Sequence, residues 1–322
     1  MKIAIVTPSV RGARSGNEHT AGRWRRLLRG LGHRVSVARE WSGGDAEVLI
    51  ALHARKSHAS IARFHRLRPG APLIVVLTGT DLYRDIKHSA AALRSLEFAS
   101  RLVVLQDQGR RAVPRRHRAK TRVIYQSSDA AVRHAPVRTC FRVAVVGHLR
   151  REKDPFRAAA ALARVPHEAG VEVVQLGAAL SAPMQRQARR WMRREPRYRW
   201  LGARPHAQTL RGMAASHLLV VSSVMEGGAN VICEAARIGV PVLASRVSGN
   251  IGMLGAGYPG YFALYDHAAL ARLIVRAASD TGYYRQLKRE TIRRRALFAP
   301  GAERAALRRL IAGSCGARKD LR

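Results

Sequence analysis

The stretch EGGANVICEA, residues 226–235, says more about the architecture of this chain than any other segment. An apolar run at 218–223 precedes it, and a second apolar run follows at 240–244. This order predicts a strand, a glycine turn, a helix over 229–238 and another strand. Open α/β sheets bind ligands beyond the carboxyl ends of their strands, so the turn is a candidate ligand site.

The turn and the helix after it have two kinds of feature. Some favour phosphate binding, and the others are two carboxylates, Glu226 and Glu234. Gly227 and Gly228 allow the backbone to approach a ligand closely, and the N–H groups that open the following helix attract phosphate. A diphosphate would repel both carboxylates, so we expect them to accept hydrogen bonds from hydroxyls, one on a sugar and one on a ribose. This helical spacing corresponds to on the order of 12 Å. The alternative is that Glu226 is a solvated turn residue and Glu234 a surface helix residue.

Alternation of strands and helices occurs twice along the chain. The strands are short continuous apolar runs, as in buried parallel sheets. We predict an α/β fold with two Rossmann-like parallel-sheet domains, 1–133 and 140–300, facing across a cleft, with the aperiodic stretch 127–139 as the linker. The helix at about 301–322 is a candidate to pack back on the first domain. The predicted strands are 3–7, 35–38, 47–52, 73–77, 102–105, 122–125, 141–146, 171–176, 198–201, 217–222 and 240–245, and the predicted helices are 20–30, 57–67, 91–99, 154–165 (opened by Asp154 and Pro155), 183–194, 206–215, 229–238 and segments after Asp266.

The composition combines an ordinary apolar content with an extreme charge. The chain has 322 residues, 47% of them hydrophobic, and a formal net charge of +37. This charge raises nucleic acid or an anionic membrane as a partner. However, only seven of the 58 basic residues are Lys, the arginines are spread along the whole length, and aromatic residues make up only 6%. A chain rich in Arg and Ala is typical of a GC-rich genome, so we expect no specific nucleic-acid partner.

The cellular setting is predicted from absent signals. No apolar run reaches the ~20 residues of a membrane span. The three cysteines, Cys140, Cys233 and Cys315, are widely spaced and show no metal-ligand pattern. We therefore expect a cytoplasmic protein with reduced thiols and no membrane span.

Four further loops follow predicted strands and carry polar side chains. In the second half, Arg150 and Lys153 are suited to neutralise a diphosphate and stabilise it as a leaving group. In the first half, residues 53–57 supply an imidazole, two cations and a hydroxyl, a set that suits a small phosphate-like acceptor. As surface loops, these segments would be unremarkable. The same placement applies to Thr78, Thr80 and Asp81, and to the loop Arg14-Ser15-Gly16-Asn17.

Together these residues resemble the GT-B glycosyltransferases, in particular family 4, over nearly the whole chain. The most specific element is Glu-x7-Glu, and the resemblance implies that Glu226 meets the donor sugar and Glu234 the nucleotide ribose. The Gly-Arg-x4-Lys element of the family corresponds to 147–153, where His148 replaces the usual Arg. Gly16-Asn17 stands where the family has Gly-Gly. The donor-binding residues expected from the residues and the resemblance are Glu234, Arg150, His148, Gly147, Gly227, Gly228, Ala229, Asn230, Gly16 and Asn17.

Within this family, several segments resemble the selenosugar synthases of selenoneine biosynthesis. They are Thr7-Pro8 with 15–17, 52–57, 78–86 and 226–230. Those enzymes join a UDP-sugar, such as UDP-N-acetylglucosamine, to selenophosphate through a carbon–selenium bond at the anomeric centre. The resemblance implies that the acceptor site for selenophosphate contains Arg55, Lys56, Ser57, Thr80, Asp81 and Arg14.

The expected reaction is sugar transfer without a metal or another cofactor, because the sequence contains no Asp-x-Asp pair. The sugar is N-acetylglucosamine or glucose, and the expected catalytic residues are Glu226, Lys153 and His53. Two alternatives stay open. One is a family 4 enzyme with a lipid or carbohydrate acceptor at an anionic membrane, and the other is a basic nucleic-acid-binding protein.

Overall fold

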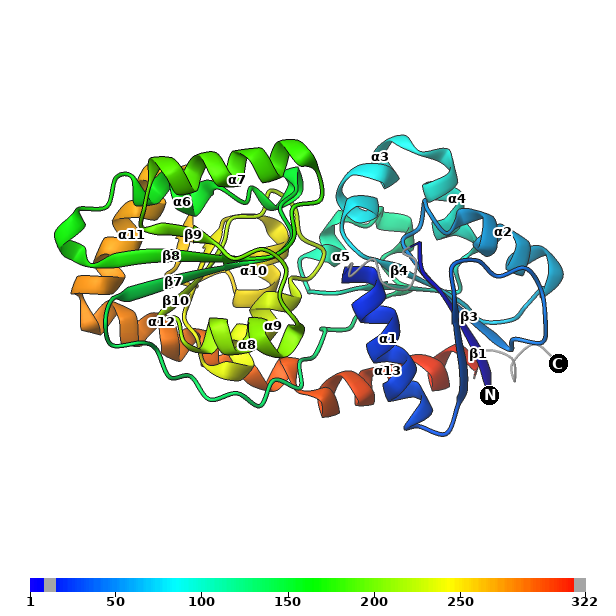
Figure 1. Ribbon diagram of the computed structural model, residues 1–322. Coiled ribbons are helices and arrows are strands. Elements are labelled where there is room, and N and C mark those ends of the chain that lie inside the picture. Colours follow the sequence, from blue (N-terminus) through cyan, green and yellow to red (C-terminus); the bar gives the residue numbers. More distant parts are fainter. Residues whose placement is uncertain (9–15, 316–322) are drawn as a thin grey trace. The chain divides into compact units, whose positions relative to one another are not determined.

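The computed structural model describes residues 1–8 and 16–315, which form two compact units (Figure 1). The first unit comprises the chain up to Gln126 together with the C-terminal helix α13 (Pro300–Cys315), and the second is Ser127–Ala299. Each contains a six-stranded sheet. The prediction of an α/β fold with two parallel sheets is confirmed. Residues 127–133, which the sequence placed in the first domain, lie in the second unit.

The sheet of the first unit has the strand order β2-β1-β3-β4-β5-β6, and its neighbouring strands pair in parallel. Its central strands, with the sequences VLIAL and LIVVL, are buried along their whole length. The strands are β1 (Lys2–Val6), β2 (Arg34–Ala38), β3 (Val48–Leu52), β4 (Leu73–Leu77), β5 (Arg101–Val104) and β6 (Thr121–Val123). The helices are α1 (Gly16–Arg29), α2 (His58–Leu67), a π-helix (Asp81–Asp85), α3 (Ile86–His88), α4 (Ala90–Phe98), α5 (Gly109–Ala112) and a 3-10 turn (Arg115–His117).

Side chains alternate between the two faces of this sheet, so each face has its own core. On one face, Trp24 of α1 and Leu307 of α13 pack against strand residues such as Ile50. On the other face, Phe64 of α2 and Leu96 of α4 join the opposite set of strand residues. The sheet is therefore covered on both sides, which explains why its strands are continuous apolar runs.

A buried carboxylate fastens α13 to α1. Glu303 is 1% exposed, and its two oxygens accept hydrogen bonds from Trp24 Nε1 at 2.7 Å and Arg23 Nε at 2.8 Å. The end of the chain thereby completes the first unit.

The sheet of the second unit has the order β12-β11-β10-β7-β8-β9, again with parallel pairs. Helix α6 packs against α11, and α8 packs against β7 and α9. The strands are β7 (Phe141–Val146), β8 (Val171–Leu176), β9 (Tyr198–Trp200), β10 (Leu218–Val221), β11 (Val242–Ser245) and β12 (Tyr261–Phe262). The helices are α6 (Arg157–Leu162), α7 (Ala182–Arg194), α8 (His206–Ala214), α9 (Asn230–Ile238), α10 (Ser248–Leu254), α11 (His267–Ser279) and α12 (Thr281–Arg293), with 3-10 turns at Arg151–Lys153, His167–Ala169 and Arg295–Phe298.

Two local predictions were wrong. Asp154 does not open the following helix, because it adopts a left-handed conformation (φ 43°) after a 3-10 turn and its carboxylate accepts a hydrogen bond from Arg157 Nε. Gly16 and Asn17 do not lie in a loop but form the start of α1. The short elements α10 and β12 and the π-helix were not predicted.

Candidate functional site

The glycine turn of the second unit lies between β10 and α9, as predicted. The N-cap residue of α9 is Ala229, and its side chain makes no capping hydrogen bond. Strand β10 lies between β11 and β7 in the sheet, which suits its apolar sequence. The chain leaves β10 through Ser222 and Ser223. An uncapped helix start at the carboxyl edge of a parallel sheet is suited to an anion.

Glu226 in this turn is nearly buried, with 8% of its surface exposed. Its carboxylate forms an ion pair with Lys153, and the Ser223 hydroxyl donates a hydrogen bond to it at 2.6 Å. The structure therefore brings together two of the three predicted catalytic residues. The contact of Lys153 with a diphosphate stays a prediction, and its amine faces Glu226.

Hydrogen bonds from the strand end hold the Lys153 loop in place. The Ser222 hydroxyl donates to the carbonyl of Asp154 at 2.8 Å, and the N–H of Val224 donates to the carbonyl of Glu152 at 2.9 Å. Two loops that are distant in sequence thus form one rigid base for the Lys153–Glu226 pair.

Helix α10 supports the same turn from another side. A Cβ atom added to Gly249 would lie 1.9 Å from the carbonyl oxygen of Glu226, so only glycine allows this approach. The Ser245 hydroxyl donates to the Ser223 carbonyl at 2.6 Å, and Asn250 Nδ2 donates to the Ser245 carbonyl at 2.9 Å. Sequence reasoning missed this support, and its one signal was Gly249-Asn250 shortly after an apolar strand.

Gly147 and Gly177 end the neighbouring strands β7 and β8, both with positive φ values. They are in close contact, because a Cβ added to Gly177 would lie 2.0 Å from the Gly147 carbonyl oxygen. His148 is half-buried, and its Nδ1 accepts a hydrogen bond from the N–H of Ala178, whereas Arg150 is exposed. A small recess at this edge is lined by Gly147, His148, Lys153, Gln175, Ser223 and Val231, among others.

Glu234, on α9, has a partner that the sequence did not predict. His206 Nε2 lies 2.9 Å from Glu234 Oε1, and this hydrogen bond raises the pKa of His206. His206 is the first residue of α8, which follows β9 in the sheet. The sequence could have indicated this contact, because His206 begins a helix after the strand at 198–200 and so lies at the same edge of the sheet as the glycine turn.

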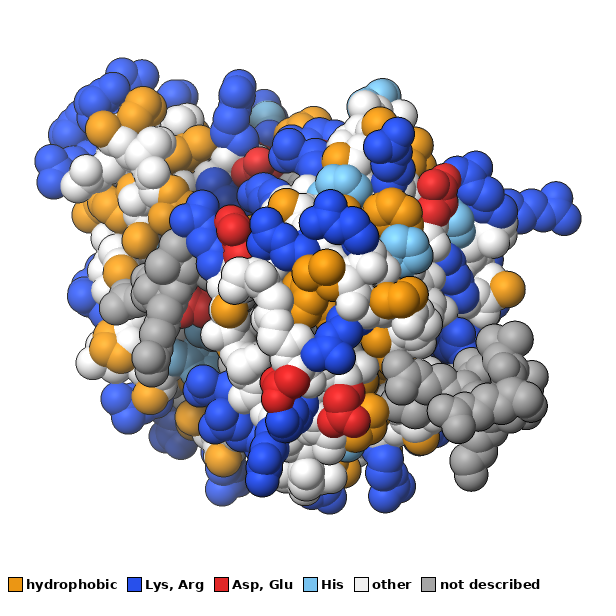
Figure 2. Space-filling model, turned by 90° about the vertical axis from the view of Figure 1, so that its right-hand side faces the viewer, with side chains coloured by type: hydrophobic (Ala, Val, Ile, Leu, Met, Phe, Trp, Pro, Cys, Tyr) orange, Lys and Arg blue, Asp and Glu red, His pale blue; other side chains and the backbone are white. Residues whose placement is uncertain are grey.

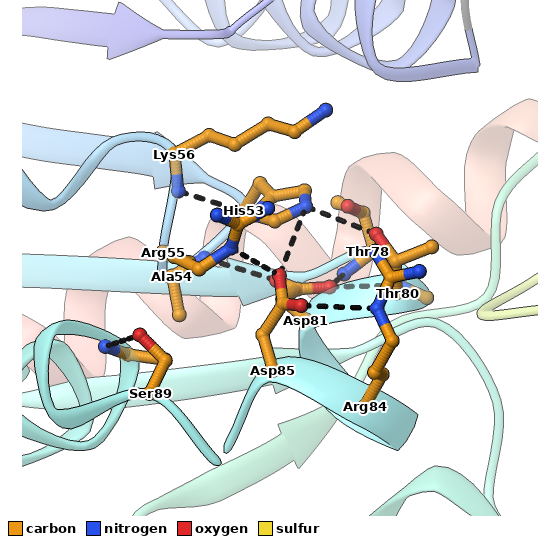
Figure 3. Close-up of polar contacts among 12 residues, drawn as sticks. His53, Ala54, Arg55, Lys56, Thr78, Thr80, Asp81, Arg84, Asp85 and Ser89 are labelled. Carbon is orange, nitrogen blue, oxygen red and sulfur yellow. Dashed lines mark hydrogen bonds and ion pairs between the residues drawn. The ribbon is translucent and has the colours of Figure 1, made fainter. Parts of the chain in front are cut away.

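The first unit has a polar cluster at the carboxyl ends of β3 and β4 (Figure 3). His53 follows β3 directly, is 2% exposed and has a φ of 75°. Its Nε2 lies 3.0 Å from Thr80 Oγ1, and its Nδ1 accepts a hydrogen bond from the N–H of Lys56 at 3.3 Å. Burial lowers the pKa of His53. This combination keeps the ring neutral.

Two carboxylates anchor this cluster. Asp81, which is fully buried, accepts hydrogen bonds from the N–H groups of Ala54, Thr78 and Gly79 at 2.9–3.0 Å. Asp85 is bound by Arg55 Nε at 2.8 Å and by Arg84 Nε at 3.3 Å, which reach it from opposite sides in Figure 3. Asp81 thereby positions the loops around it, and its predicted contact with an acceptor stays a prediction.

The other residues predicted to bind an acceptor differ in exposure. Arg55 and Lys56 are exposed, and Figure 3 shows the Lys56 amine directed away from Asp85. The Ser57 hydroxyl is buried and donates to the carbonyl of Leu52 at 2.7 Å. Arg14 lies outside the described residues.

Three further features bear on partners: metal-binding clusters, membrane-spanning helices and the distribution of basic side chains. Within residues 1–8 and 16–315, no group of three or more His, Cys, Asp or Glu side chains is placed to hold a metal ion. Among the helices of the same residues, none is both long and apolar enough to cross a bilayer. Lys and Arg side chains are scattered over the face shown in Figure 2 and do not form one patch.

Two units, each built on a six-stranded parallel sheet, form the GT-B fold, and solved structures share it. Anabaena HepE in complex with UDP-glucose is 18% identical, with a TM-score of 0.79 over 97% of this chain and 100% of that chain. A sucrose-phosphate synthase from Thermosynechococcus elongatus is 17% identical, with a TM-score of 0.80 over 98% and 99%. A glycosyltransferase from Rickettsia africae is 12% identical, with a TM-score of 0.73 over 97% and 98%.

The family itself is defined by sequence. The family model described as glycosyl transferases group 1 matches residues 133–294, and the chain belongs to this family of glycosyltransferases. A search of curated proteins finds no match. The matched residues all lie within the second unit.

Proposed function

We propose that this glycosyltransferase moves a sugar, N-acetylglucosamine or glucose, from a UDP-sugar to selenophosphate. The observation that carries the donor half is the Lys153–Glu226 pair beside the uncapped start of α9. HepE, which shares the fold, has been solved with UDP and with UDP-glucose. By analogy, UDP binds the second unit, with Glu234 on the ribose and Glu226 on the sugar.

The acceptor half rests on the cluster in the first unit and on the resemblance to selenosugar synthases. Arg55, Lys56 and Arg84 surround a neutral His53, so the cluster suits a small, multiply charged anion. Selenophosphate is such an anion, and its selenium is a strong nucleophile.

The proposed step balances without a redox partner. A lone pair on selenium forms the bond to C1 of the sugar, while the bond from C1 to the UDP oxygen breaks and its electron pair leaves on UDP. Lys153 and the start of α9 stabilise the diphosphate charge as it departs. Oriented cations and backbone N–H groups suffice for this, so the scheme needs no metal.

The direct test is to incubate the protein with several nucleotide sugars, with and without selenophosphate, and to identify products by mass spectrometry. We expect UDP and a selenium-containing sugar, formed equally well with a chelator present. Transfer only to lipid or carbohydrate hydroxyls would contradict the proposed acceptor. Complete loss of activity with the chelator would contradict the metal-free scheme.

One observation favours a second candidate, a lipid or carbohydrate acceptor at an anionic membrane. Helix α7 exposes five arginines and has Ala188 as its buried residue. Basic helices of this kind bind anionic lipid surfaces. The five exposed arginines are Arg186, Arg189, Arg190, Arg193 and Arg194. The test compares the wild type with a variant in which three of these five are changed to Gln. It measures how much of each protein co-sediments with vesicles that contain anionic lipid.

A further inference from the structure

The backbone of His53 is held in an unusual conformation from both sides. Its N–H donates to the Val76 carbonyl at 2.9 Å, and its carbonyl accepts from the N–H of Ser57 at 3.0 Å. A left-handed φ at a residue other than glycine costs free energy and persists where the surroundings over-determine it. Such residues cluster at functional sites, which makes the contacts of the His53 ring a place to look for a function.

The hydrogen bonds of the ring fix its tautomer. The N–H of Lys56 can only donate, so His53 Nδ1 must be an acceptor. Burial lowers the pKa of His53, while the neighbouring charges act in both directions, since Asp81 and Asp85 raise it and Lys56 and Arg55 lower it. In the neutral ring the proton therefore resides on Nε2.

The Nε2–H group determines the direction of the Thr80 hydroxyl. It lies 3.0 Å from Thr80 Oγ1, whereas Asp85 Oδ2 is 3.8 Å away and too distant for a hydrogen bond. Thr80 accepts from His53, so its own proton must be directed elsewhere. Among the described residues, the contact with His53 is the one hydrogen bond of Thr80 Oγ1, which leaves the hydroxyl proton for a ligand.

Both carboxylates of the cluster are engaged by donors within the first unit. Three backbone N–H groups occupy Asp81, and two guanidinium groups occupy Asp85. What remains for a ligand is a set of donors: the Thr80 hydroxyl, the Lys56 amine, and the outer N–H groups of Arg55 and Arg84, which bind Asp85 through Nε.

We infer that His53 is a positioning residue that locks the Thr80 hydroxyl as a hydrogen-bond donor, so that the cluster selects an anionic, phosphate-like group. The inference rests on the proposed function for the role of this group as the sugar acceptor. An alcohol acceptor must give up a proton when it attacks, and the basic groups of this cluster, the Asp85 carboxylate and His53 Nδ1, already accept hydrogen bonds from other donors. A deprotonated anion needs only donors.

The experiment measures binding of inorganic phosphate to the full chain by calorimetry, without any turnover. Thr80→Val should weaken phosphate about 10-fold, the usual effect of losing one hydrogen bond to a charged group. Thr80→Ser should retain the wild-type affinity. His53→Asn keeps the Nδ1-side acceptor and tolerates a positive φ, but it lacks the distal donor, so it should weaken phosphate several-fold. His53→Gln, which restores a distal donor, should recover part of the loss.

The decisive variant is the double substitution His53→Asn with Thr80→Val. Since His53 acts through Thr80, the double variant should bind phosphate as Thr80→Val does, with no further loss. Additive losses, or an unchanged affinity of Thr80→Val, would overturn the inference. If the His53 variants fold poorly, equal phosphate affinity of Thr80→Val and Thr80→Ser still overturns the inference, because the hydroxyl would then not act as a donor. Phosphate binding that depends on Thr80, together with an absence of selenosugar product, would refute the proposed function and leave this inference standing.

Discussion

The carboxylates of the two units are used in opposite ways. In the second unit, Glu226 pairs with Lys153 and Glu234 with His206, at the edge where the glycine turn and its recess lie. In the first unit, Asp81 and Asp85 are occupied by internal donors, and the groups left for a ligand are donors. The family model matches only the second unit. The difference teaches that the carboxylates of the second unit stand where a ligand can reach them, whereas those of the first unit hold its loops in place.

The largest effect should come from Glu226→Gln. This change removes the negative charge that holds Lys153 and that we propose faces the donor sugar. Sugar transfer should fall by about 10²–10³-fold, the scale for losing one electrostatic contact to a transition state. Steady-state rates of UDP release measure it. Glu168→Gln, at an exposed position of the same unit, is the matched control. A rate near that of the wild type would place the reacting sugar elsewhere.

Asp81→Asn tests the anchoring role in the first unit. Asparagine has one acceptor oxygen for three N–H donors and brings an NH2 group against them. The free energy of unfolding of the first unit should drop by about 2–4 kcal/mol. Denaturant titration measures the drop, with the exposed Asp107→Asn as control. UDP affinity should not change, and a selective loss of UDP binding would contradict the separation of roles.

Gly249→Ala tests the support of the glycine turn by α10. The new methyl group would displace the Glu226 carbonyl, so the carboxylate would leave its position. We expect a loss of about 1–3 kcal/mol in stability and a rate reduction smaller than that of Glu226→Gln. Gly257→Ala, where a Cβ atom meets nothing within 4 Å, is the control. Equal behaviour of the two variants would show that the contact is unimportant.

Glu234→Ala should weaken UDP by about 10-fold, because a ribose hydroxyl would lose a charged acceptor. Calorimetric titration with UDP measures this. His206→Ala, which leaves the carboxylate in place, should change UDP affinity less. An unchanged affinity of Glu234→Ala would remove Glu234 from the nucleotide site.

The smallest effect concerns pH. The hydrogen bond to Glu234 raises the pKa of His206, with burial opposing it and Asp129 adding to it. The stabilisation is therefore fully present below the ordinary histidine pKa and is lost as the pH rises through the raised value. The difference in unfolding midpoint between wild type and His206→Gln should be larger at pH ~5.5 than at pH ~8.5, and modest because the side chain is half-exposed. A difference that grows with pH would contradict this pairing.

The sheets and the glycine turn could be predicted because their signals are local. A run such as LIVVL at 73–77 can only be a buried strand in this context, and glycines before a helix mark a turn. The partners of the site could not be predicted, because they are set by topology. His206 and Glu234 are 28 residues apart and meet through the packing of α8 on α9. Asp81 was predicted as a ligand because the sequence does not reveal that three backbone N–H groups surround it.

Glu303 has a practical consequence for work with fragments. A first half produced as residues 1–126 would lack the carboxylate that binds Trp24 and Arg23, as well as the apolar side of α13 that covers one face of the sheet. Such a fragment would present an open hydrophobic surface and a tryptophan N–H without its partner, and it should aggregate. Grafting residues 300–315 onto its end through a flexible tether should yield a soluble half-molecule for acceptor studies.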